Sequence, residues 1–190
     1  QEGLPVVAVN TRKVDIDLYR IGDRNLIAAV RGDDFLTNLT AYQAEELRDT
    51  SGIKLWSGSL DIEPSLNKDV VTAFPVLEAL GGKTEPGLYV MTAKAPGSKA
   101  DEYDAQATQW FVVSDFGLTA LTGNGGVDVV VRSLGSAKPL ADVEVRLLAR
   151  NNEVLQTKRS DGDGRVGFDP GLARGTGGMA PALVVASNKS

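Results

Sequence analysis

Short segments in which apolar and polar residues alternate run through most of the chain, and this period of two constrains the fold most strongly. Val14, Ile16 and Leu18 alternate with Asp15, Asp17 and Tyr19, which predicts a strand with one buried and one exposed face. Similar strands are expected at 53–57, 69–74, 88–93, 107–113, 127–132, 143–149, 153–157, 165–168 and 182–186. Gly, Asn, Asp and Pro separate them, a spacing typical of antiparallel β-sandwiches.

Two segments in the first half are less regular. The apolar run 25–31 ends at Gly32-Asp33-Asp34 and is predicted to be a further strand. In 38–48, Leu39, Ala44 and Leu47 recur near one side of a helix, with Asn38 or Thr40 as its N-cap and Gly52 beyond its end. The sequence therefore predicts one short helix of about three turns or less.

The strand pattern pauses at 114–126 and then restarts. We therefore expect an all-β protein made of two antiparallel, immunoglobulin- or fibronectin-like sandwiches in tandem, with domains at 1–117 and 118–190. Only about 70 residues follow this boundary, against roughly 100 in a typical immunoglobulin-like sandwich, so truncation of the second domain at its carboxyl end is an open alternative.

Two residue types are missing, and their absence excludes several functions. The 190 residues include neither Cys nor His. Disulfides, thiolate zinc sites, cysteine nucleophiles and a Ser-His-Asp triad within the chain are therefore excluded. The net charge is −5 and no long basic run is present, which argues against a nucleic-acid partner.

No apolar run approaches the roughly 18 residues that indicate a membrane-spanning helix. The segment 1–5 also lacks the basic and apolar regions of a signal peptide. Both ends look cut, and we expect a piece of a longer protein.

The motif Asp161-Gly162-Asp163-Gly164 has two competing interpretations. An EF-hand loop that begins at Asp161 would place Arg165 at its fifth position, where an oxygen ligand is needed, and it also lacks the required Gly and Glu. A hairpin turn between the flanking strands explains the residues better, because Gly and Asp tolerate positive φ. Asn151-Asn152 is predicted to be a second hairpin turn.

Other candidate sites also have simpler structural explanations. The Gly-rich run 171–178 is followed by Pro181 rather than by the Lys-Ser/Thr and helix of a phosphate-binding loop, so it is predicted to be a mobile loop. The carboxylate pairs Asp33-Asp34 and Glu45-Glu46 fit a solvated surface. The sequence thus predicts no catalytic residue, cofactor site or metal site.

Trp110, Phe111 and Phe116 flank the proposed domain boundary. Trp110 or Phe111 would most simply be a core residue of the first sandwich. In the alternative, Phe116 and Trp110 pack between the domains and fix the angle between them, and these two are the candidate site residues.

Several stretches of the chain resemble bacterial alpha-2-macroglobulins. The resemblance is strongest at 109–118, 127–134, 137–145, 147–152, 160–166 and 174–178, and weaker at 17–20 and 86–89. It implies two consecutive macroglobulin-like domains from the amino-terminal half of a large periplasmic protease trap, often anchored to the inner membrane as a lipoprotein.

This family resemblance implies a scaffold role for the chain. Family members trap proteases through a bait segment and a Cys-Gln thioester, and neither the thioester nor the lipidated Cys can be carried over to a chain without Cys. The implied partners are neighbouring domains of the parent chain, with proteases bound through parts outside this one. The alternative is a carbohydrate- or protein-binding module of a secreted multidomain protein.

Overall fold

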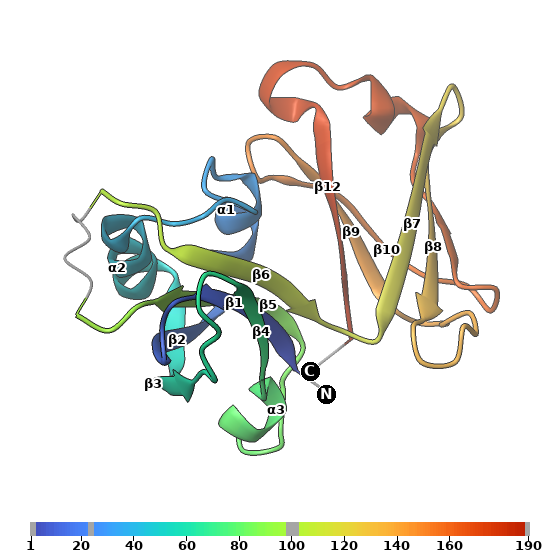
Figure 1. Cartoon of the computed structure of the whole chain (residues 1–190). Helices are drawn as coiled ribbons and strands as arrows, with labels where there is room; N and C mark the ends of the chain where they lie inside the picture. Colours follow the sequence, from blue (N-terminus) through green and yellow to red (C-terminus); the bar gives the residue numbers. More distant parts are fainter. Residues whose placement is uncertain (1–2, 23–24, 98–102, 189–190) are drawn as a thin grey trace. The chain divides into compact units, whose positions relative to one another are not determined.

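The computed structural model describes residues 3–22, 25–97 and 103–188, and the chain divides into two compact units at Val113/Ser114 (Figure 1). This division lies just before the boundary expected from the sequence at 117/118. The reason is that Phe116 and Gly117 already pair with Ser133 and Arg132, which belong to the second unit. Antiparallel strands build both units, which confirms the predicted all-β class.

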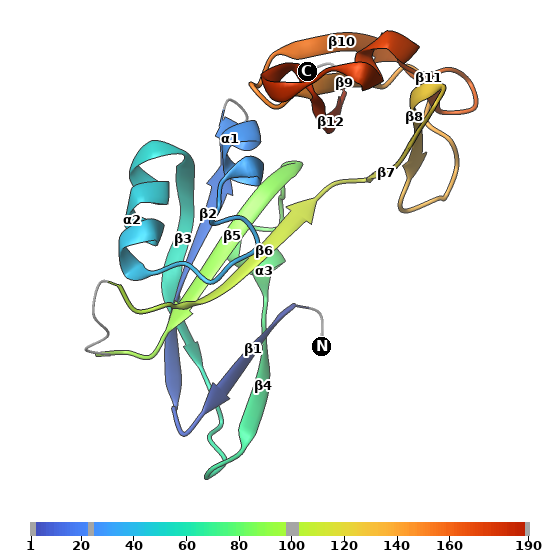
Figure 2. The ribbon, with the colours of Figure 1, turned by 90° about the horizontal axis from the view of Figure 1, so that it is seen from above.

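The first unit contains a four-stranded sheet in the order β3-β2-β5-β6 and a separate pair, β1-β4, visible in Figure 2. All pairings within it are antiparallel. The elements are β1 (Leu4–Val9), β2 (Lys13–Ile21), α1 (Leu26–Arg31), α2 (Ala41–Thr50), β3 (Gly52–Asp61), β4 (Asp69–Phe74), α3 (Val76–Ala79), β5 (Gly87–Lys94) and β6 (Ala107–Val113).

Both faces of the four-stranded sheet are covered. Ile16, Leu18 and Met91 pack toward β1 and β4, where Phe74 closes the cluster. On the opposite face, the buried cluster combines sheet residues with residues from the helical region: Ile21, Leu88, Val90, Trp110, Leu39 and Ala44. The alternation of Val14, Ile16 and Leu18 seen in the sequence thus corresponds to one buried face, as predicted.

One predicted strand is a helix. Segment 25–31 contains α1, because Leu26, Ala29 and Val30 recur at helical spacing and pack together against the second cluster. The helix predicted at 38–48 is confirmed as α2. Its N-cap is Thr40, whose Oγ1 accepts from the Gln43 backbone while the Gln43 side chain accepts from the Thr40 backbone.

The second unit consists of two three-stranded antiparallel sheets in the orders β11-β8-β7 and β10-β9-β12. Their facing side chains form one buried cluster: Val127, Val129, Val131, Val143, Val145, Leu147, Val166 and Phe168. The elements are β7 (Phe116–Gly123), β8 (Gly126–Ser133), β9 (Glu144–Ala149), β10 (Val154–Arg159), β11 (Arg165–Gly167), η2 (Pro170–Arg174), η3 (Gly177–Met179) and β12 (Pro181–Ser187).

The segment Asp161–Gly164 is a turn, but not a hairpin turn. It connects β10 of one sheet to β11 of the other, so the predicted hairpin is wrong although the turn itself is confirmed. The Asp161 carboxylate accepts from the backbone N–H groups of Asp163 (2.9 Å) and Arg165 (2.8 Å), and Gly164 has a φ of 72°. The carboxylate therefore holds its own loop in shape.

Two further loop predictions have different outcomes. Asn152 has a φ of 70° in the turn between β9 and β10, which confirms the hairpin predicted there. The Gly-rich run predicted to be a mobile loop contains the short 3-10 helices η2 and η3. Leu172 and Ala173 of η2 pack against the core of the second unit, and the mobility of the run stays a prediction.

Gly164→Ala is expected to destabilise the second unit by about 2 kcal/mol. The residue needs a positive φ, and an added Cβ would collide with the carbonyl oxygen of Val131. Hydrogen exchange of the β8 amides should report the loss. Gly162→Ala is the matched control, since a Cβ there meets nothing within 4 Å. Equal protection in the two variants would contradict the role assigned to Gly164.

Candidate functional site

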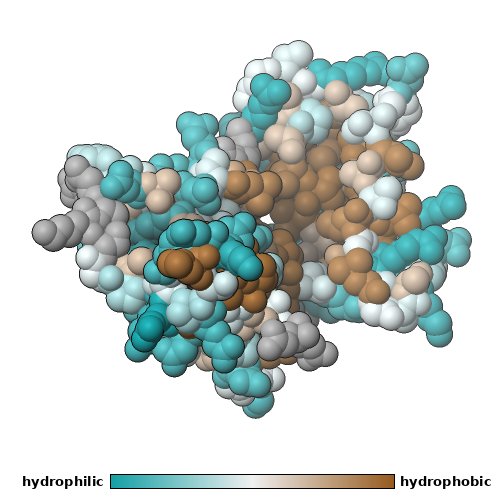
Figure 3. Space-filling view, in the orientation of Figure 1, coloured by the Kyte–Doolittle hydropathy of each residue, from teal (hydrophilic) through white to brown (hydrophobic). Residues whose placement is uncertain are grey.

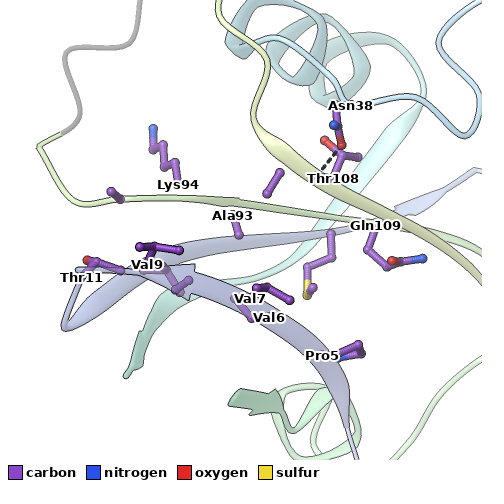
Figure 4. A pocket seen from close by; sticks show the side chains of 15 residues that line it. Pro5, Val6, Val7, Val9, Thr11, Asn38, Ala93, Lys94, Thr108 and Gln109 are labelled. Atoms are coloured by element: carbon purple, nitrogen blue, oxygen red, sulfur yellow. Dashed lines mark hydrogen bonds between the residues drawn. The ribbon is translucent and has the colours of Figure 1, made fainter. Parts of the chain in front are cut away.

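A groove in the first unit lies between β1 and the strands β5 and β6 (Figure 4). Its volume is about 460 Å³, and most of its wall is apolar, with Val6, Ala8 and Met91 among the lining residues. Lys94 is the charged residue among the lining residues that the structure describes. Such a wall suits apolar or extended backbone segments.

Trp110 is a core residue of the first unit. Its side chain is 7% exposed, packs at 75° against the ring of Phe35, and donates from Nε1 to the Thr37 carbonyl oxygen at 3.1 Å. Phe111 points to the opposite face of the sheet and stacks on Tyr89. Trp110 therefore joins β6 to the segment before α2.

Phe116 begins β7 and packs against the core of the second unit. The preceding residue, Asp115, accepts hydrogen bonds from the Gly135 backbone and the Ser133 hydroxyl, and these contacts lower the pKa of its carboxyl group. The two candidate residues of the sequence analysis thus lie in separate hydrophobic clusters. Their packing between domains stays a prediction.

One carboxylate of each predicted pair has a local structural contact. Asp34 accepts from the Gln43 side chain at 2.6 Å, beside the capping box of α2, and Glu45 pairs with Arg48 one turn along that helix. Among residues 3–22, 25–97 and 103–188, no group of three or more acidic side chains is placed to hold a metal ion. In the same residues, no helix is long and apolar enough to cross a membrane.

A polar cluster on β2 and β3 escaped the sequence analysis. Asp17 accepts from Lys54 Nζ at 2.7 Å and from Ser57 Oγ at 2.5 Å. Burial acts to raise the pKa of Asp17, but the hydrogen bonds from Lys54 and Ser57 together outweigh it and lower the pKa. Burial, and then the Asp17 charge, raise the pKa of Tyr19 to about 12. Lys54 and Ser57 lie 37 and 40 residues after Asp17 in the sequence, so only the strand register reveals that they are its partners.

This cluster predicts acid sensitivity of the first unit. A carboxylate with a lowered pKa in the folded state contributes stability above its unfolded pKa and loses it as pH falls below about 4. Asp17→Asn and Lys54→Met should each flatten the decline in urea midpoint between pH 5 and pH 3. Tryptophan fluorescence isolates this unit, because Trp56 and Trp110 both lie in it. If the urea midpoint of both variants declined with pH as steeply as that of the parent sequence, the role assigned to the Asp17 cluster would be contradicted.

Substitutions at Trp110 should separate its ring from its hydrogen bond. Trp110→Ala is expected to cost about 3–5 kcal/mol through the cavity, and Trp110→Phe about 1–2 kcal/mol through the smaller ring and the lost hydrogen bond to the Thr37 carbonyl. Calorimetric unfolding measures both. Val112→Ala, on the same strand but 66% exposed, should stay within about 0.5 kcal/mol of the parent sequence. A loss at Val112 equal to that at Trp110 would refute the core assignment.

Comparison with known proteins identifies relatives for both units. Residues 1–111 match the family model of the bacterial alpha-2 macroglobulin MG2 domain, and residues 113–190 match that of the MG3 domain. The chain is 27% identical over 165 residues to alpha-2-macroglobulin of Escherichia coli K12, and 28% over 170 residues to that of Xylella fastidiosa Temecula1. These matches cover 87% and 84% of the chain but only 10% of each relative's length.

Solved structures share the fold. The native E. coli alpha-2-macroglobulin fragment spanning domains NIE-MG1 has a TM-score of 0.77 at 24% identity, and covers 98% of this chain and 84% of that one. The trypsin-activated E. coli protein has a TM-score of 0.73 at 23% identity, over 97% of this chain and 12% of its own. Sequence and structure comparisons thus agree along nearly the whole chain.

Proposed function

This chain belongs to the bacterial alpha-2-macroglobulin family, as a fragment spanning its MG2 and MG3 domains, and from that premise we propose that it is a non-catalytic scaffold of a protease-trapping protein. The observation that carries the proposal is that its acidic side chains accept hydrogen bonds within the fold. Four carboxylates of the described residues, Asp17, Asp34, Asp115 and Asp161, each accept hydrogen bonds that fix a strand, a helix start or a turn.

The parent molecule is proposed to act on proteases through regions outside this fragment. One relative of known structure was obtained as trypsin-activated alpha-2-macroglobulin, which supports a response of such proteins to a protease. In this proposal the neighbouring domains are the direct partners, the parent lies in the periplasm on a lipid anchor, and Trp110 and Phe116 help to set how the two domains pack. The fragment supplies rigid layers that hold those regions in place.

The scaffold role is tested in the parent protein by a substitution that destabilises the second unit. Val145 is fully buried on β9, so Val145→Asp would place an unpaired charge in the core of the second unit. The expected result is a loss of trypsin retention of at least about tenfold, measured as trypsin that co-elutes with the parent in gel filtration. Val154→Asp, at a position 51% exposed on the adjacent strand, is the matched control and should retain trypsin normally.

Two results would overturn the scaffold proposal. Normal trypsin retention by the Val145→Asp parent, with loss of its β9 amide protection, would make these domains dispensable for trapping. Saturable hydrolysis of any substrate by the 190-residue chain would make it an enzyme.

The groove beside β1 favours a second candidate function, a protein-binding module. Saturable binding of a peptide that is abolished by Val7→Asp would replace the scaffold proposal with this one.

A further inference from the structure

The turn between β7 and β8 contains Asn124-Gly125, the one Asn-Gly step in the 190-residue sequence. These two residues connect Gly123 to Gly126, which pair with each other as the last pair of the hairpin. Asn124 and Gly125 are both exposed, and a Cβ at Gly125 would meet nothing within 4 Å. The Asn124 side chain therefore lies at the surface, beside the backbone nitrogen of a residue that has no side chain.

Other asparagines of the chain are in a different situation. Hydrogen bonds hold the side chains of Asn10, Asn25, Asn38, Asn67 and Asn151. The residues that follow these five are Thr, Leu, Leu, Lys and Asn, and each has a Cβ that crowds its own backbone nitrogen. Asn124 differs from them because it is followed by glycine at an exposed turn.

We propose that Asn124 is a site of spontaneous deamidation in the folded protein. The Gly125 backbone nitrogen loses its proton to solvent and attacks Cγ of Asn124, so that a new C–N bond closes a succinimide ring. The bond between Cγ and Nδ2 breaks, and Nδ2 takes a proton from solvent and leaves as ammonia. A water molecule then opens the ring at either carbonyl carbon, which gives aspartate or isoaspartate. Glycine favours ring closure because it has no Cβ to obstruct the approach.

The products change the hairpin in two ways. Both add a negative charge to the turn, and isoaspartate also adds a CH₂ group to the backbone. A two-residue turn sets the register of its strands, so the longer backbone no longer fits the pairs Gly123↔Gly126 and Thr122↔Val127. Val127 is buried in the core of the second unit, and Figure 3 shows apolar surface over β7. The structure thus implies that isoaspartate loosens the end of the hairpin and uncovers apolar residues there.

Peptide mass spectrometry of the folded 190-residue chain tests the site. During incubation at neutral to mildly basic pH, the peptide with Asn124 should gain about 1 Da at least about tenfold faster than the peptides with Asn10 or Asn38. Gly125→Ala is the matched control, because Gly125 does not have a positive φ and the added Cβ meets nothing within 4 Å. It should slow the mass gain at least about tenfold. Equal rates with Gly125 and with Ala would overturn the proposal.

The same incubation in urea separates a site of the folded protein from a property of the Asn-Gly step alone. Because the turn is exposed, the folded chain should react at a rate within about threefold of the unfolded chain. A mass gain that occurs only in urea would mean that the folded hairpin protects Asn124, and would overturn the proposal.

Hydrogen exchange tests the effect on the hairpin. The isoaspartate form, separated by chromatography, should exchange the amides of residues 121–123 and 126–128 at least about fivefold faster than the fresh chain. Asn124→Asp carries the added charge without the longer backbone and should exchange like the fresh chain. If the isoaspartate form exchanged no faster than Asn124→Asp, the proposed loosening by the added CH₂ group would be wrong.

Discussion

The first unit is organised around β5, a strand whose two faces lie in two different hydrophobic clusters. Leu88 and Val90 face the helices, whereas Met91 and Ala93 face β1 and β4. Because this strand is buried on both faces, it lacks the polar alternation of β2 and appears in the sequence as an almost continuous apolar run. The two layers that pack on the sheet both depend on it, since neither the β1-β4 pair nor α1 and α2 contribute a complete core by themselves.

Local patterns predicted the strands well and their partners poorly. The alternation at Val14, Ile16 and Leu18 is a local feature that the sequence predicts, and the cap at Thr40 is one of the two that it offers, beside Asn38. Segment 25–31 was assigned as a strand because a short apolar run fits a buried strand and a buried helix equally. The turn at Asp161–Gly164 was recognised from its residues, but the strands it connects belong to different sheets, which only distant pairings determine.

The candidate sites were harder to predict for the same reason. Trp110 was recognised as a possible core residue, yet its partners Phe35 and Thr37 are more than 70 residues away in the sequence. The groove beside β1 joins segments from both ends of the first unit, and no local motif marks it. Polar residues such as Asp17 look available for chemistry in sequence, and become structural once strand register places Lys54 and Ser57 beside them.

The crossing at Asp161–Gly164 also has a mechanical consequence for the second unit. The two strands of a hairpin pair with each other, so tension on the hairpin breaks their residue pairs one after another. Strands β10 and β11 instead pair with strands of different sheets. Tension applied at this crossing reaches the short ladder between β11 and β8, whose residue pairs run from Arg165↔Val130 to Gly167↔Asp128, and the ladder between β10 and β9 in the other sheet. A force on the loop held by the Asp161 carboxylate is therefore shared by both sheets.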